Sequence, residues 1–294
     1  MKKSSNGYIL AIASALSFSL VSIVGKIIMT RGINPSILIF WQYTAVLIGL
    51  ALYFYFAKVS IRIETPYILL GGLFSVAANF SFYTSMNLTG AGLATLFIYF
   101  SPVFIALFFS LSGIRQITSS GWLAILLALL GSALTLGIFS GIKIQVLGVI
   151  AGLFAGLFYA SYNIALDLKL TKINFLIINF YVALQGLILI SLFNFTQAIK
   201  PWAILPKEIL AIVFLGLLGG VLPNFLNFAS IRLIGSDKTS VIMSTELPAT
   251  VLLAFFFLEE KMSLMQILGI VLVLASVLLL KSQEDPCEES LPER

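Results

Sequence analysis

Residues 69–90 read LLGGLFSVAANFSFYTSMNLTG, and residues 214–235 read FLGLLGGVLPNFLNFASIRLIG. When the two stretches are aligned at an offset of 145, nine positions carry identical residues, which is more than shared hydrophobicity would give. A second pair of windows, INPSILIF from Ile33 and INFLIINF from Ile173, adds four identities at an offset of 140. The sequence therefore predicts an internal duplication, and each polar residue has to be considered in both copies.

The composition of the 294-residue chain indicates a membrane protein. The chain is 60% hydrophobic and 10% charged, with a mean hydropathy of +1.09, whereas a soluble domain carries about a quarter charged residues. The apolar runs recur at intervals of roughly 20 residues, the length that a helix needs to cross about 30 Å of hydrocarbon. The sequence therefore predicts an all-α membrane protein, and the continuous runs exclude a barrel of alternating short strands.

Turn formers and charges divide the apolar sequence into ten predicted transmembrane helices. The predicted spans are Gly7–Met29, Ser36–Ala57, Pro66–Met86, Ala91–Leu111, Gly121–Phe139, Gln145–Leu166, Asn174–Phe193, Lys207–Ala229, Thr239–Leu258 and Met262–Leu280. The first five form a predicted repeat over residues 7–139, and the last five form a second repeat over residues 145–281. Residues 282–294 are acidic and contain no apolar run, so we expect a disordered cytoplasmic tail.

An odd number of spans in each repeat means that the second repeat enters the membrane from the opposite side. Such inverted repeats support alternating access, because exchanging the conformations of the two halves converts a state open to one side into a state open to the other. The sequence thus predicts a secondary active transporter whose partners are the lipid bilayer and a small-molecule substrate.

The distribution of Lys and Arg between the short loops predicts the orientation. With the N-terminus inside, eleven of these residues fall on the cytoplasmic side and five on the outer side. Both termini are therefore predicted to be cytoplasmic, with the protein in the cytoplasmic (inner) membrane. The apolar run after Lys2 and Lys3 lacks a small-residue cleavage site, so we expect an uncleaved first span and not a signal peptide.

No cofactor and no nucleic-acid partner are expected. The chain has no histidine and a single cysteine, Cys287 in the tail, so the usual zinc, haem and iron–sulfur ligand sets cannot be assembled. The net charge of +5 reflects the loop bias and gives no argument for nucleic acid. Small residues in spans 5 and 10 would suit close helix packing or a dimer contact, which leaves a monomer and a homodimer open. These residues are Gly131, Ser132, Ala275 and Ser276.

Three stretches carry a resemblance to a known family. They are FLEEKMSLMQILGIVLVLASVLLL from Phe257, the Pro248 stretch before it, and ALSFSLVSIVGK from Ala15, which ends at Lys26. In these stretches the chain resembles the EamA family of the drug/metabolite transporter superfamily, ten-span carriers of small organic solutes. The resemblance implies a cavity between the halves, lined mainly by spans 1, 3, 4, 6, 8 and 9, with spans 5 and 10 outside it. The first repeat departs from the family pattern, because SGIRQITSSGW has no acid in the place of Glu260.

The ninth predicted span carries an acidic residue, Glu246, in the stretch VIMSTELPATVLL. In a continuous helix, Thr239, Met243, Glu246 and Thr250 share one stripe. A charged side chain at this depth costs about 2.5–3.5 kcal/mol, so it must face water, face a partner or be protonated. Three interpretations stay open: a neutral acid bonded to a neighbouring helix, a site that binds a substrate amine or a proton, and a shallower placement of the span.

Two prolines, Pro102 in YFSPVF and Pro248 in STELPAT, occupy similar places in the two repeats. Each removes a backbone donor and frees carbonyl groups one turn earlier, near Tyr99 and Ser244. We expect a helix kink at each proline, which either bends during transport or only shapes the packing. Phe100 lies near the position that Glu246 occupies in the other repeat.

Further polar and aromatic side chains on the predicted cavity spans are candidate substrate contacts. They are Ser22 and Lys26, Asn79 and Tyr83, Tyr99 and Phe100, Tyr159, Tyr162 and Asn163, Asn224 and Asn227, and Thr250. An aromatic stripe of Phe97, Phe100 and Phe104 opposite an acidic wall would suit an amphipathic solute with an amine. The alternatives are interhelical hydrogen bonds for the amides, packing for the aromatic residues, and snorkelling for Lys26, which could instead pair with Glu246.

These observations favour a transporter that moves a small organic metabolite, amino-acid-like or amphipathic and cationic, with export among the directions it can serve. A channel or a non-transporting receptor is the alternative, although the sequence contains no ring of like charges and no filter-like loop. An intramembrane enzyme is disfavoured, because rhomboid-type and site-2 proteases need histidine. The aspartates that an aspartyl protease would need, Asp167 and Asp237, lie at predicted span ends.

Overall fold

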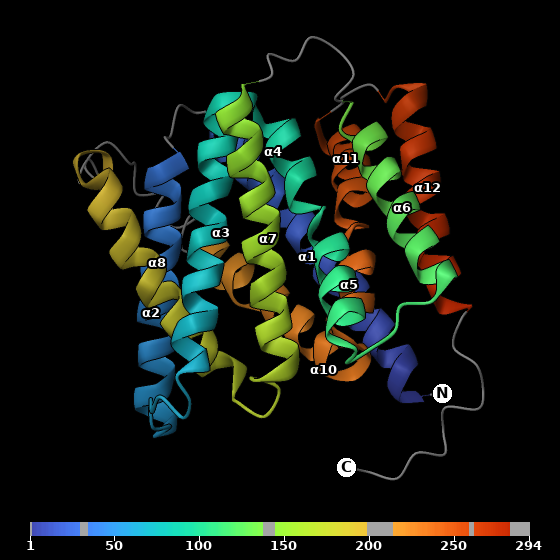
Figure 1. The fold of residues 1–294 in the computed structure, drawn as a ribbon. Coiled ribbons are helices and arrows are strands. Elements are labelled where there is room, and N and C mark those ends of the chain that lie inside the picture. The colour runs from blue at the N-terminus through green and yellow to red at the C-terminus, as the bar shows by residue number, and fades with distance from the viewer. Residues whose placement is uncertain (1, 30–34, 138–144, 199–213, 259–261, 283–294) are drawn as a thin grey trace.

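The computed structural model describes residues 2–29, 35–137, 145–198, 214–258 and 262–282, and these residues fold as a bundle of helices (Figure 1). The elements are α1 (Lys2–Met29), α2 (Pro35–Ala57), α3 (Tyr67–Thr89), α4 (Ala91–Ile98), α5 (Ser101–Ser112), α6 (Ser119–Thr135), α7 (Val146–Leu168), α8 (Phe175–Ala198), the π-helix η2 (Leu215–Gly219), α10 (Leu222–Met243), α11 (Glu246–Leu258) and α12 (Leu264–Lys281). Eight segments are long and apolar enough to cross a bilayer, and α6 and α11 are shorter apolar helices. The predicted all-α membrane fold is thereby confirmed.

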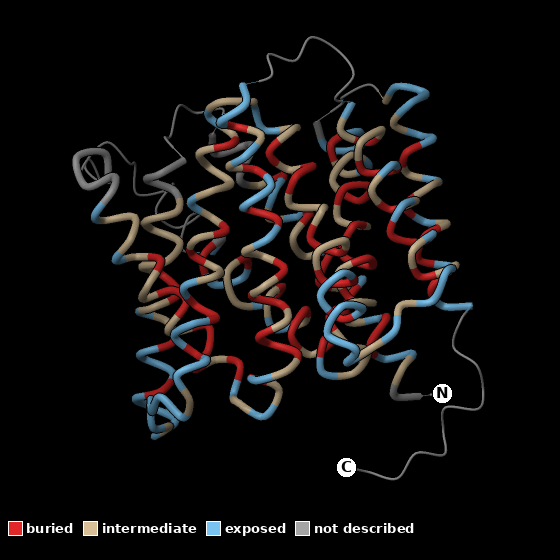
Figure 2. The backbone as a smooth tube through the Cα atoms, viewed as in Figure 1, coloured by how far each residue is buried: buried red, intermediate tan, exposed pale blue. Residues whose placement is uncertain are grey.

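The outer surface of the bundle is apolar, as contact with lipid requires. Figure 2 shows exposed positions on the outside of the bundle and buried positions concentrated inside it. On α12, for example, Leu268, Leu274 and Leu278 are exposed over 49%, 49% and 67% of their surface. Because lipid tails are as apolar as leucine, this exposure carries no penalty in a bilayer.

The boundary between the eighth and ninth spans differs from its prediction. The helix continues beyond the predicted end at Ala229, because no helix breaker occurs before Gly235. Gly235 has a φ of 84° and a ψ of 162°, so the chain turns there and the ninth span begins at Ser236, inside α10. The predicted start of the eighth span, Lys207, lies outside the described residues.

The backbone repeats itself at the offset found in the sequence. Gly90, the repeat mate of Gly235, has a φ of 87° and a ψ of 161°, nearly the same values. Both values of φ fall where glycine is tolerated and other residues are strained. Spans 4 and 9 also break at equivalent places, since the N–H of Phe100 donates to Phe97 O at 3.2 Å and the N–H of Thr245 donates to Ile242 O at 3.0 Å. The two halves therefore share turns and breaks as well as residues.

The breaks correct the register of the expected pairing around the prolines. After the break in span 4, α5 begins at Ser101, and after the break in span 9, α11 begins at Glu246. Ser101, and not Phe100, is therefore the structural mate of Glu246. Pro102 and Pro248 stand one residue out of register, each within the first turns of its second helix.

Helix contacts divide the molecule into two bundles, each of which takes helices from both halves. In one, α3 packs against α4 and α7, and α7 also packs against α4 and α5. In the other, α1 packs against η2, α10 and α11. We name α3, α4, α5 and α7 the first bundle, and α1, η2, α10 and α11 the second bundle. The packing of α3 on α7 is the repeat equivalent of the packing of α10 on α1.

Two further helix pairs flank these bundles at opposite edges (Figure 1). They are α2 with α8 at one edge and α6 with α12 at the other. A Cβ on Gly131 would lie 2.8 Å from the carbonyl oxygen of Gly269, so the contact between α6 and α12 depends on small residues. Gly131, expected to serve close packing or a dimer contact, is used for packing within the chain.

Candidate functional site

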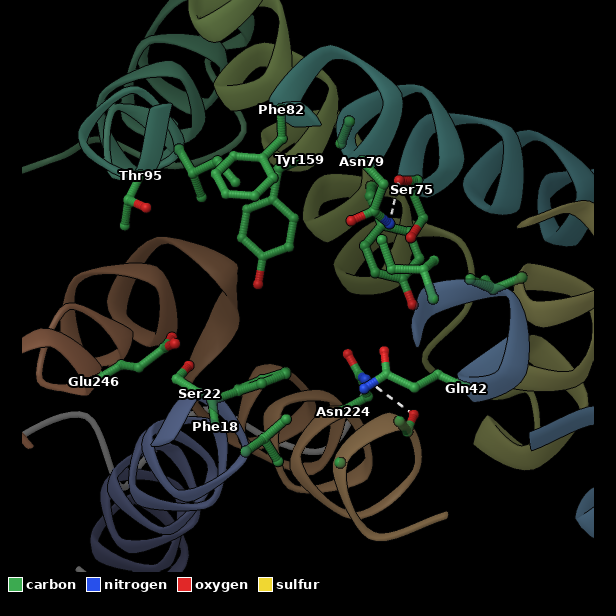
Figure 3. Close-up of a pocket in the computed structure, with 18 of the residues that line it drawn as sticks. Phe18, Ser22, Gln42, Ser75, Asn79, Phe82, Thr95, Tyr159, Asn224 and Glu246 are labelled. Carbon is green, nitrogen blue, oxygen red and sulfur yellow. Dashed lines mark hydrogen bonds between the residues drawn. The ribbon is translucent and has the colours of Figure 1, made fainter. Parts of the chain in front are cut away.

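A cavity of about 570 Å³ lies between the two bundles (Figure 3). The first bundle lines it with Asn79, Phe82, Tyr83, Thr95, Tyr99, Tyr159 and Tyr162, and the second bundle with Phe18, Ser22, Asn224, Glu246, Leu247 and Thr250. Helices α2 and α8 close a third side with Gln42, Tyr43 and Asn179 among others. The volume falls in the range of about 300–1,000 Å³ that small-molecule sites occupy.

The cavity reaches from mid-depth toward one face of the molecule. We name the face with the first residues of α1 and the last residues of α12 the terminal face, and the opposite face the far face. In α1 the lining residues are Phe18, Val21 and Ser22, which lie beyond the middle of the helix, and Leu136, at the far end of α6, also lines the cavity. The cavity therefore extends toward the far face.

Glu246 is held at the break of the ninth span. Its side-chain oxygen Oε2 accepts a hydrogen bond from the Tyr99 hydroxyl at 3.2 Å, and its backbone carbonyl accepts one from Thr250 Oγ1 at 2.8 Å. Tyr99 belongs to the equivalent break of the fourth span. Because broken helices leave backbone groups without helical partners, both breaks create polar surface at the cavity. The two breaks thus meet across the cavity.

Amide side chains gather on the wall away from Glu246. Asn79 Nδ2 donates to Tyr43 Oη and to the carbonyl oxygen of Ser75, each at 3.1 Å. Asn224 Nδ2 and Asn179 Nδ2 both donate to the carbonyl oxygen of Gly220, at 3.0 and 3.1 Å. The repeat mates Asn79 and Asn224 thus stand on opposite bundles and both face the cavity (Figure 3).

Aromatic side chains fill the space between these polar ends. The hydroxyl of Tyr159 points between Glu246 and Asn224, and Phe18 and Phe82 contribute apolar rings (Figure 3). A tyrosine offers an apolar ring and a polar tip. The cavity can therefore hold an apolar body while its carboxylate, hydroxyls and amides contact polar groups at the two ends.

Most of the site residues named from the sequence line this cavity. Those that do are Ser22, Asn79, Tyr83, Tyr99, Tyr159, Tyr162, Asn224, Glu246 and Thr250. Asn163, Asn227 and Phe100 do not line it. The side chain of Lys26 lies outside the described residues, so its expected pairing with Glu246 stays a prediction.

Asn163 and Asn227 contact each other on the terminal side of the cavity. Asn227 Nδ2 donates to Asn163 Oδ1 at 3.3 Å, and both residues are 3% exposed. Asn163 belongs to the first bundle and Asn227 to the second, so their hydrogen bond joins the bundles. These two amides form a contact between the bundles, which agrees with the alternative interpretation of the amides as interhelical hydrogen bonds.

The expected aromatic wall on span 4 is wrong. Phe97 packs its ring on Gly152 and Phe104 packs its ring on Gly156, so both rings turn toward α7. The Phe100 ring lies 6.2 Å from the Phe97 ring and outside the cavity lining. The expected stripe of span 9 is interrupted for a related reason, because the break moves Thr239 and Met243, both buried, out of line with Glu246.

The sequence reasoning missed the contribution of spans 2 and 7. Ile39, Gln42 and Tyr43 on α2 line the cavity, and at the offset of 140 their mates on α8 are Asn179, Val182 and Ala183, which line it as well. Gln42 and Asn179 are amides in mainly apolar spans, and they lie three residues apart when the repeats are aligned at the offset of 140, so they were the signal that could have identified this wall.

Comparisons with known proteins agree with this architecture. The model of the EamA-like transporter family matches residues 5–137 and again residues 146–282. An uncharacterized transporter from Synechocystis sp. is 28% identical over 213 residues, which cover 69% of this chain and 62% of that protein, so the match spans less than two thirds of the relative. The crystal structure of another protein superposes with a TM-score of 0.77 at 17% identity, covering 95% of this chain and 97% of that one, which shows a shared fold.

Proposed function

The chain belongs to the EamA-like transporter family, and from this premise we propose that it is a secondary active transporter that moves a small organic amine across the cytoplasmic membrane by alternating access. One observation carries the proposal. The cavity between the two bundles places the carboxylate of Glu246 on one wall and hydroxyl and amide groups on the others. A carrier needs such a site between two parts that can move against each other.

Alternating access is supported by the distribution of packing along the bundle axis. On the far side of Glu246 the bundles are separated by the cavity, and on its terminal side they touch through buried residues such as Asn163 and Asn227. Within the second bundle, hydrogen bonds join α1 to α10. Ser14 Oγ donates to Pro223 O at 2.7 Å, and Ser230 Oγ donates to Gly7 O at 2.9 Å. Rigid bundles with a contact on one side of a central site are what a rocking movement requires.

The lining supports a substrate with a cationic amine and an apolar part. Glu246 offers a carboxylate in a partly dehydrated site, where a charge-assisted hydrogen bond to an ammonium group is stronger than in water. The rings of Phe18, Phe82 and Tyr159 offer apolar surface and faces that attract cations. The amides of Asn79 and Asn224 suit a carbonyl or carboxylate group, so amino-acid-like and amphipathic cationic solutes fit the same lining.

Proton coupling follows from the same residue. A carboxylate in the middle of the membrane is costly when it has no counter-charge. Glu246 would therefore hold a proton when the cavity is empty and exchange it for the ammonium group of the substrate, which keeps the site near neutral in both loaded states. Under this mechanism the amine and the proton compete for one carboxylate.

Transport in proteoliposomes tests the proposal. Counterflow with a panel of labelled amino acids and aromatic amines should show saturable exchange for at least one solute, which a channel would not show. For that solute, Glu246→Gln should lower the apparent affinity about 10- to 100-fold, the worth of a hydrogen bond to a charged group. Glu64→Gln, at an exposed loop position, is the matched control. Wild-type affinity and pH dependence in Glu246→Gln would refute the role of this carboxylate.

A further inference from the structure

A charged cluster lies at the terminal face, outside the cavity. Arg115, in the loop between α5 and α6, binds Asp167 with both arms of its guanidinium, Nη1 to Oδ2 at 2.7 Å and Nη2 to Oδ1 at 2.9 Å. Nη1 also donates to Asp237 Oδ1 at 2.9 Å. The Oδ2 atom of Asp167 further accepts from the backbone N–H and the hydroxyl of Ser236, each at 2.8 Å. We name Arg115, Asp167, Ser236 and Asp237 the clasp.

The clasp joins the two bundles. Asp167 lies in the last turn of α7 and Arg115 follows α5, so both belong to the first bundle, whereas Ser236 and Asp237 belong to α10 in the second bundle. Two of its contacts therefore cross between the bundles, Arg115 with Asp237 and Ser236 with Asp167. The pair of Arg115 and Asp167 lies within the first bundle and orients the guanidinium for the crossing.

The local structure is shaped around the guanidinium. A Cβ on Gly235 would lie 2.5 Å from Arg115 Nη1, and the φ of 84° at this residue is one that glycine adopts without strain. On the other side, the Phe109 ring lies 4.5 Å below the Arg115 carbon Cζ. Burial opposes the charge, but hydrogen bonds and attraction from Asp167 and then Asp237 outweigh it and raise the pKa of Arg115. The guanidinium stays charged and fixed in place.

The clasp remains within reach of water. The Arg115 side chain is 35% exposed, whereas Asp167 and Asp237 are 5% and 17% exposed. Water can therefore solvate the groups as they separate, which lowers the cost of opening in comparison with a fully buried ion pair. A contact of this kind suits a conformational change better than permanent support.

The clasp is connected to the cavity by continuous helix. From Asp237 the helical residues of the ninth span lead to the break before Glu246, nine residues further on, about 13 Å at the rise of an α-helix. From Asp167, helix α7 leads back to Tyr159 in the cavity wall. Asn163 and Asn227 lie between the two levels. A separation of the bundles at the clasp would therefore widen the cavity at its terminal side.

We propose that the clasp is the gate at the terminal face: it holds the two bundles together while the cavity is open toward the far face, and it must break before a solute can leave or enter at the terminal face. This inference rests on the proposed alternating access. It adds the residues that hold one of the two states.

Thiol labelling of purified protein tests the gate without any substrate. The background is Cys287→Ser, which removes the single cysteine of the chain. In it, Asn227→Cys reports on the buried contact between the bundles on the terminal side of the cavity, and Ser22→Cys reports on the cavity itself. In detergent both faces are accessible to a membrane-impermeant maleimide, so the orientation of the protein does not affect the result. Arg115→Gln should raise the labelling rate at residue 227 about fivefold or more and lower the rate at residue 22, because the population shifts away from the clasped state.

Three further variants separate a gate from a structural tie. Asp237→Asn weakens only one of the two crossing contacts, that of Arg115 with Asp237, and should shift both labelling rates in the same directions as Arg115→Gln. Arg115→Lys keeps the charge without the two-armed geometry and should lie between the parent and Arg115→Gln. Arg62→Gln, in an exposed loop, removes the same charge elsewhere and should leave both rates unchanged.

The outcomes are distinguishable from failure of the proposed function. If the folded Asp237→Asn and Arg115→Lys proteins label at the parent rates and only their thermal midpoints fall, the clasp is a structural tie and the inference is overturned, whatever Arg115→Gln does. If the labelling rates shift but no amine is transported, the gate stands and the substrate proposal fails.

Discussion

Tyr99 and Glu246 form a hydrogen bond of 3.2 Å between the two helix breaks that the repeat places at equivalent positions. Tyr99 ends the first part of span 4 in one bundle, and Glu246 begins the second part of span 9 in the other. The duplicated scaffold thus brings its two equivalent helix breaks together, and the only acid among the described lining residues is at that meeting point.

Removal of the Tyr99 hydroxyl should reduce the affinity for an amine substrate. In Tyr99→Phe the ring stays, but Glu246 loses the donor that fixes its carboxylate toward the cavity. We expect the KM for the transported amine to rise about tenfold, in line with about 1.5 kcal/mol for a hydrogen bond to a charged group. Tyr181→Phe, on α8 outside the lining, is the control. An unchanged KM in Tyr99→Phe would show that Glu246 needs no positioning.

A methyl group at Gly186 should alter the cavity from behind. A Cβ there would lie 2.6 Å from two atoms of the Tyr43 ring, so Gly186→Ala must push this ring toward the cavity and strain its bond to Asn79. We expect a lower thermal midpoint and a several-fold rise in KM with an unchanged maximal rate. The double variant Gly186→Ala with Tyr43→Leu relieves the clash and should recover the thermal midpoint but not the affinity. Recovery of both would mean that Tyr43 only fills space.

Alanine should be tolerated differently at the two equivalent glycines. Gly90→Ala and Gly235→Ala meet the same backbone strain, about 1–3 kcal/mol, because their φ values are 87° and 84° and their ψ values are 161° and 162°. A Cβ at Gly90 meets open space among the described residues, whereas at Gly235 it collides with Arg115 and Asp237. Both variants should lose a few degrees of thermal midpoint, and only Gly235→Ala should raise maleimide labelling at Asn227→Cys. Equal labelling in the two variants would show that the turn at Gly235 does not influence the clasp.

The contact between α6 and α12 should support stability and not binding. Gly269→Val places branched carbons where a Cβ alone would lie 2.6 Å from the carbonyl oxygen of Gly131. We expect a loss of about 1–3 kcal/mol, as for other overpacked contacts, read as a lower thermal midpoint in detergent. The KM of the protein that remains folded should be unchanged, since neither glycine lines the cavity. A changed KM would link this edge of the molecule to the site.

Much of the fold followed from two features of the sequence. The duplication around Asn79 and Asn224 predicted related halves, and the length of the apolar runs predicted ten spans. The turn at Gly235 was missed because the turn formers and charges that follow Ala229 suggested an earlier end of the span, whereas the helix continues as far as Gly235.

Site residues could be predicted from the sequence where a single polar residue was unusual for its position. Glu246 stood out because an acid in an apolar span needs a reason, and Asn79 and Asn224 stood out as repeat mates. Phe100 was misplaced because a helical stripe presumes an unbroken helix, and span 4 breaks at that residue.

The clasp could not be predicted from spacing. Arg115 and Asp167 are 52 residues apart, and Arg115 and Asp237 are 122 residues apart. Arg115 follows α5, Asp167 lies in the last turn of α7 and Asp237 follows the turn at Gly235, and a charge is ordinary at each of these places. Only the packing of α5, α7 and α10 brings them within hydrogen-bond distance.

The equivalence of Ser101 and Glu246 has a consequence for the direction of transport. Ser101 is 3% exposed and neutral, so the two halves are alike in backbone and unlike in charge. On the proposed mechanism, the state open to one side is not a chemical mirror image of the state open to the other. The same solute should then half-saturate the carrier at different concentrations on its two sides, which gives a duplicated and nearly symmetric scaffold a kinetic polarity.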